Sequence, residues 1–125
     1  MAHVRFVSLI LLAALAAGCS RSAPEPARHV NPPKQLSEQQ ALDLLVKELK
    51  AHRVPDLDCL GFMDESDHPP NAKAAEWEFA AHEIHDQRCG GDPGVSPVRD
   101  RYQVKASGKI LVYNAADAEF VKFPR

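Results

Sequence analysis

One amphipathic helix, placed early in the chain, constrains the fold more than any other feature. Ser37 and Gln40 have the spacing of a capping box, in which the serine caps the helix and the glutamine reaches back to it. Pro55 ends the pattern. The spacing predicts a helix over 38–52 with a single apolar stripe, which needs a partner surface and most simply a sheet. The stripe consists of Ala41, Leu42, Leu45, Val46 and Leu49.

Strand patterns follow the helix. We expect short strands over 57–63, 101–106, 109–113 and 120–123, with a turn at Ser107-Gly108. The stretch 76–84 is ambiguous, because its apolar residues fit both an alternating strand and a helical stripe; we favour the strand and place Trp77 in the core. One helix followed by four or five antiparallel strands predicts an α+β domain, and this order resembles cystatin-like and PepSY-like architectures.

The N-terminus carries the marks of an export signal. Arg5 precedes an apolar run from Phe6 to Ala17, which is shorter than the roughly 20 residues that span a bilayer. The run ends in Leu15-Ala16-Ala17-Gly18-Cys19, which resembles the lipobox of bacterial lipoproteins. The resemblance implies removal of residues 1–18 and lipidation of Cys19. The alternatives are an ordinary secretory signal cut after Ala16 and, less favoured, a membrane-spanning anchor.

The lipoprotein resemblance divides the chain and gives it a location. Residues 19–35 are rich in proline and form a tether, and residues 36–125 form one domain. Ser20 follows the cysteine, which implies an outer-membrane protein facing the periplasm and attached to the membrane through its lipid. With Cys19 lipidated, Cys59 and Cys89 remain as a pair in an oxidising compartment, and we expect them to form a disulfide.

Charge argues against one class of partner. The chain has 15 Lys and Arg against 17 Asp and Glu, a net charge of −2, and no basic cluster. Nucleic-acid binding needs such a cluster, so we expect no nucleic-acid partner.

The densest polar cluster runs from His82 to Asp86. On a helix, His82, His85 and Asp86 would share a face and form a weak candidate metal site, with Glu83 beside them; on a strand, the two histidines point to opposite sides. The following run 90–94, Gly-Gly-Asp-Pro-Gly, fits either an anion-binding nest or a tight turn. No coherent set of nucleophile, base and orienting group occurs, so we expect no enzyme and no cofactor.

Residues 79–113 carry a second resemblance. Glu83-x-His85, Cys89-Gly90-Gly91-Asp92-Pro93, Pro97, Arg101-Tyr102-x-Val104 and Gly108-Lys109-Ile110 are similar to a segment of small uncharacterised bacterial secreted proteins and lipoproteins. That resemblance implies a strand, a cysteine-anchored loop and a hairpin. It implies no activity.

We therefore expect a non-catalytic module that binds or inhibits another envelope protein. The candidate contact surface is the loop from Gln87 to Arg101, with Arg99, Asp100 and Arg101 as candidate binding residues beside Arg88 and Asp92. Two alternatives stay open: the loop is a structural connection with exposed charges, or the protein binds a small ligand or metal through His82 and His85.

Overall fold

A computed structural model describes residues 34–124. The predicted leader, the predicted lipidation at Cys19 and the tether as far as residue 33 lie outside the described residues. The described chain begins with strand β1 (Leu36–Ser37), which leads directly into helix α1 (Glu38–Ala51). The Ser37 hydroxyl accepts from the Gln40 backbone N–H at 3.3 Å, and the Gln40 side chain accepts from the Ser37 N–H at 2.9 Å. The predicted capping box and helix are confirmed.

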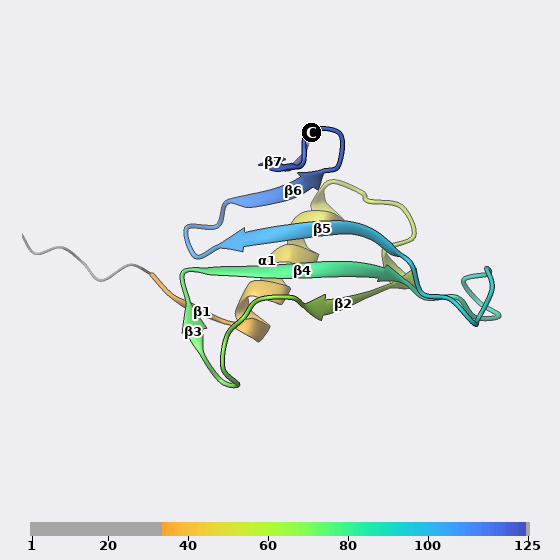
Figure 1. Ribbon diagram of the computed structural model, residues 1–125, viewed down its shortest axis with the longest axis horizontal. Helices are drawn as coiled ribbons and strands as arrows, with labels where there is room; N and C mark the ends of the chain where they lie inside the picture. The colour runs from red at the N-terminus through yellow and green to blue at the C-terminus, as the bar shows by residue number, and fades with distance from the viewer. Residues whose placement is uncertain (1–33, 125) are drawn as a thin grey trace, which may run out of the picture. The chain divides into compact units, whose positions relative to one another are not determined.

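A five-stranded antiparallel sheet follows the helix. Its strands lie in the order β2 (Leu60–Asp64), β4 (Glu76–Glu83), β5 (Val98–Lys105), β6 (Ile110–Asn114) and β7 (Glu119–Lys122) (Figure 1). A separate two-stranded sheet pairs β1 with β3 (Lys73–Ala74). The expected α+β class and the antiparallel sheet are therefore confirmed.

Helix α1 packs against one face of the sheet (Figure 1). Leu45 and Leu49 of its apolar stripe are fully buried, and the strands contribute alternate residues to the same core. Trp77 is 2% exposed, and its indole N–H donates to the Leu36 carbonyl at 2.9 Å, so its predicted place in the core is confirmed. The strand residues of this core include Phe79, Ala81, Tyr102, Val104, Ile110 and Val112.

The structure decides the ambiguous stretch and corrects two boundaries. Residues 76–83 form β4, so the strand interpretation is confirmed. The predicted strand over 57–63 begins instead as a 3₁₀ turn, η1 (Leu57–Cys59), before β2. Strand β5 starts at Val98 rather than 101: the register shifts at a bulge between Ala81 and His82, and beyond it His82 still pairs with Val98.

Within residues 34–124, no helix combines the length and the apolar character needed to cross a membrane.

Candidate functional site

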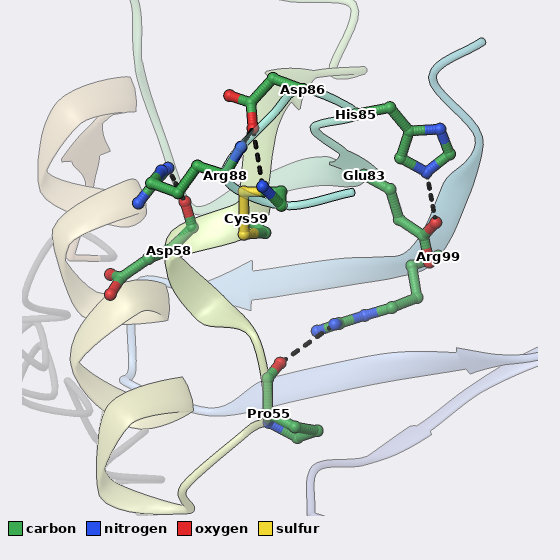
Figure 2. The surroundings of a disulfide bond; sticks show 9 residues. Pro55, Asp58, Cys59, Glu83, His85, Asp86, Arg88 and Arg99 are labelled. Atoms are coloured by element: carbon green, nitrogen blue, oxygen red, sulfur yellow. Dashed lines mark hydrogen bonds and ion pairs between the residues drawn. A yellow bond between two sulfur atoms is a disulfide. The ribbon is translucent and has the colours of Figure 1, made fainter. Parts of the chain in front are cut away.

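The expected disulfide joins Cys59 to Cys89, with the two Cα atoms 5.6 Å apart (Figure 2). It ties the end of η1 to the loop that follows β4. The Ile84 N–H also donates to the Cys59 carbonyl at 2.8 Å. Three segments therefore meet here: 55–59, the loop 84–97, and the beginning of β5 at 98–101. We call these three segments the stapled end.

Asp86 organises the turn that presents Cys89. Its carboxylate accepts from the backbone N–H groups of Arg88 at 2.9 Å and Cys89 at 2.7 Å, and its carbonyl accepts from Gly90 at 2.7 Å. The bond from the Cys89 N–H is the main cause that lowers the pKa of Asp86. These three backbone N–H groups are thus used within the turn.

The glycine-rich run also forms a turn that bonds to itself. The Asp92 carboxylate accepts from the Gly94 N–H at 2.9 Å, and the Asp92 carbonyl accepts from the Val95 N–H at 3.1 Å. Gly91 has a φ of +83°, and a Cβ built on it would lie 2.6 Å from the His85 ring. These contacts favour the turn interpretation over the anion-binding nest.

His85 connects two parts of the loop. Its Nε2 lies 3.0 Å from the Glu83 carboxylate and its Nδ1 lies 3.0 Å from the Asp92 carbonyl. Both partners are acceptors, so only the doubly protonated ring satisfies both. Accordingly the Glu83 carboxylate first, and the Asp92 carbonyl second, raise the pKa of His85.

His82 has a different partner. Its Nδ1 lies 3.0 Å from the Ser96 carbonyl, while the Ser96 hydroxyl donates to the Glu83 carbonyl at 3.0 Å. His82 lies on β4, whereas His85 lies beyond the end of the strand, in the loop, and Asp86 accepts hydrogen bonds from its own turn. Among residues 34–124, His, Cys, Asp and Glu side chains gather nowhere in a group of three that could hold a metal ion.

Two arginines attach the loop and β5 to segment 55–58. Arg88 donates from Nη2 to the Asp58 carbonyl at 2.9 Å, and Arg99 donates from Nη1 to the Pro55 carbonyl at 3.0 Å. Figure 2 shows both guanidinium groups directed toward this segment. Each arginine therefore supports the stapled end with one hydrogen bond to a backbone carbonyl.

The three predicted binding residues line one pocket at the beginning of β5, but their side chains have different partners. Arg99 and Asp100 lie together, with the Arg99 Nε 3.6 Å from the Asp100 carboxylate, which also accepts from the Tyr102 hydroxyl at 3.4 Å. Arg101 pairs in register with Ala80 and bonds to Glu65 at 2.8 Å. Since neighbouring residues of a strand point to opposite faces, Arg101 is directed away from the helix.

Three pockets surround Arg99. The first, about 320 Å³, is mainly apolar; besides Arg99 it is lined by Val54, Pro55, Asp100, Tyr102, Val112 and Phe123. The second, about 370 Å³, lies where the pairing of β5 with β6 ends, between residues 98–101 and 113–116. The third, about 400 Å³, is polar and lies beside the disulfide.

Two of the three residues named from the sequence, Arg99 and Asp100, line the apolar pocket, but the sequence did not indicate the pocket itself. Val54 and Pro55 follow α1, whereas Phe123 follows β7, and the three residues meet only in the folded chain. No local pattern marks such a pocket.

Comparison with protein-family models, with curated proteins and with solved structures found no match to this chain.

Proposed function

We propose that this chain is a lipid-anchored lipoprotein of the bacterial cell envelope that binds or inhibits another protein without catalysing a reaction. The lipobox-like sequence before Cys19 supports the anchor and the outer-membrane location facing the periplasm. The Cys59–Cys89 disulfide suits an oxidising compartment. The helix on an antiparallel sheet is compatible with a cystatin-like or PepSY-like architecture, in keeping with a binding module.

The observation that carries this proposal is the position of Arg99, which borders three pockets on an end of the domain that is fixed by a disulfide. At protein interfaces a few side chains supply most of the binding energy, and arginine is enriched among them. Such side chains often insert into pockets of the partner protein. A surface that is already ordered loses little entropy on binding. The apolar pocket beside Arg99 and Asp100 is suited to an apolar side chain of the partner.

The side chains that could serve in catalysis or metal binding form structural hydrogen bonds instead. His85 joins Glu83 to the Asp92 carbonyl, and Asp86 caps its own turn. This favours a binding role for the stapled end. The alternative, small-ligand or metal binding through His82 and His85, has less support, because each ring bonds to a different carbonyl.

Capture of partners from detergent-solubilised envelopes tests the proposal. We expect Arg99→Ala to weaken capture, because it removes the cation shared by the three pockets. Lys109→Ala is the matched control: it removes an exposed cation from the β5–β6 turn, at the other end of β5. Thermal unfolding of both variants confirms that they are folded. Equal capture by the two variants, or no specific partner, would contradict the proposal.

A further inference from the structure

We propose that strand β2 pairs edge to edge with β2 of a second copy of this chain, so that the two five-stranded sheets join into one antiparallel sheet. Strand β2 lies at one edge of its sheet, and among the described strands it pairs with β4 alone (Figure 1). This contact goes beyond the proposed function, because it does not depend on any partner bound at the stapled end.

Two hydrogen bonds fix the direction of the backbone groups of β2. The Ile84 N–H donates to the Cys59 carbonyl at 2.8 Å, and the Glu65 N–H donates to the Glu78 carbonyl at 2.8 Å. These two pairs flank β2 and continue its register with β4. Since hydrogen-bonded pairs alternate along an antiparallel strand, the odd-numbered residues of β2 bond to β4, and the even-numbered residues direct their backbone groups away from the sheet.

The outward groups belong to Leu60, Phe62 and Asp64. The Leu60 N–H donates to the Leu57 carbonyl. The remaining outward N–H and C=O groups form no hydrogen bond with residues 34–124. A sheet edge that presents unpaired donors and acceptors is a template for an additional strand.

The two edges of the sheet differ in their protection. Strand β7, at the other edge, carries Glu119 and Lys122 and is followed by Pro124. Charged residues and proline are usual means by which proteins prevent pairing at an edge. Strand β2 contains no lysine, arginine or proline, and its one charged side chain, Asp64, accepts from the Ser66 N–H at 2.8 Å. Strand β2 is therefore the edge open to a second strand.

Apolar surface is exposed beside this open edge. Among the described residues, three large apolar side chains are exposed, and two of them, Met63 and Ile84, lie on β2 or directly beside it. The Ile84 Cγ1 lies 3.9 Å from a Cβ built on Gly61. Leu60 and Phe62 pack in or against the core, so Gly61 and Met63 lie on the opposite face of the strand, away from the helix.

A two-fold axis through Phe62 makes β2 complementary to itself. The two Phe62 residues then exchange backbone hydrogen bonds, and each Asp64 N–H donates to the Leu60 carbonyl of the second copy. Each Met63 lies opposite Gly61 of the second copy, in a pair of the non-hydrogen-bonded kind, in which side chains are closest. Because Gly61 has no side chain, there is room for Met63 over it. This self-complementarity favours a second copy over an unrelated strand as the occupant.

Sedimentation velocity of the purified full-length protein, in density-matched detergent and over a range of concentrations, tests the proposal. We expect a monomer–dimer equilibrium. Asp64→Pro removes one outward N–H from each copy and leaves the bonds between β2 and β4 intact, so dimerisation should weaken at least about tenfold. Asp64→Ala is the matched control, because it removes the same carboxylate but keeps the N–H, and it should dimerise like the wild type. Thermal unfolding of both variants confirms that they are folded.

Introduced cysteines test the register. A mixture of differently tagged Gly61→Cys and Met63→Cys proteins should form a disulfide between the two tags under mild oxidation. Position 61 accepts the change, because a Cβ there makes only an ordinary contact with Ile84 and the φ of Gly61 is not left-handed. The control mixture combines Gly61→Cys with Lys122→Cys, at the exposed edge of β7, and should form little of this product.

Three results would overturn the proposal: a monomer at every concentration, a dimer that Asp64→Pro leaves unchanged, or equal cross-linking in the two cysteine mixtures. A chain that stays monomeric by itself but captures a different protein, with capture lost in Asp64→Pro, would assign the edge to that protein and exclude the second copy. Neither result bears on capture through Arg99, which the Arg99→Ala and Lys109→Ala variants test separately.

Discussion

Removing the disulfide should destabilise the domain by a calculable amount. We consider the double variant Cys59→Ser/Cys89→Ser, which leaves no free thiol at the stapled end. The cysteines are 30 residues apart in the sequence. On the chain-entropy account, closing a loop of that size stabilises the fold by roughly 3–4 kcal/mol, since the bridge restricts the unfolded chain. For a domain of this size, that loss corresponds to a fall in Tm of roughly 12–30 °C.

Urea unfolding followed by the fluorescence of Trp77 measures the effect, because this buried residue becomes exposed on unfolding. The slope of free energy against urea separates a change in stability from a change in the compactness of the unfolded state. Reduction of the wild-type protein with a thiol reagent is the matching control and should give a similar loss. A double variant within about 0.5 kcal/mol of the oxidised wild type would refute the reasoning, since that is the size of an ordinary surface substitution.

Three further predictions concern the core and the loop. Leu45→Ala should lower the free energy of unfolding, measured by chemical denaturation, by about 2–5 kcal/mol, because Leu45 is fully buried. Leu44→Ala should lower it clearly less, because Leu44 is partly exposed. Gly91→Ala should lower the Tm more than Gly90→Ala: both glycines have positive φ, but only at position 91 would the Cβ collide with the His85 ring. The third prediction concerns pH. Folding raises the pKa of His85 above 6.5, so protonated His85 stabilises the folded state. That contribution to stability is fully present below pH 6.5 and is lost as pH rises through the folded pKa. NMR titration of His85 together with amide exchange in the loop checks this; a pKa at or below 6.5 would contradict it.

Local sequence patterns were sufficient for the main elements. The Ser37–Gln40 capping box and the apolar stripe of α1 are short-range features, and the structure reproduces both. The alternation around Trp77 left a choice between strand and helix; in the structure this stretch pairs on both sides, with β2 and β5. That pairing depends on distant residues, which local periodicity does not show.

The candidate site was predictable only in part. The disulfide followed from counting cysteines once Cys19 was assigned to the lipid, and Arg99 with Asp100 followed from the charge of the loop. The bulge near Ala81 and the orientation of Arg101 toward Glu65 depend on strand register. The contacts of both arginines with segment 55–58 join residues that are 30 and 44 positions apart. Such contacts arise from tertiary folding and leave no local signal.

Site-specific photocrosslinking in intact cells tests the central claim, that the stapled end contacts a partner protein. One variant carries a photoreactive side chain at Val95, which is 52% exposed in the loop 84–97. The matched control carries it at Met63, which is 58% exposed on β2, outside the stapled end. The account predicts a discrete adduct with another protein from position 95 that is absent from position 63 and weakened by Arg99→Ala. Adducts with another protein in equal yield from both positions, or from position 63 alone, would contradict it.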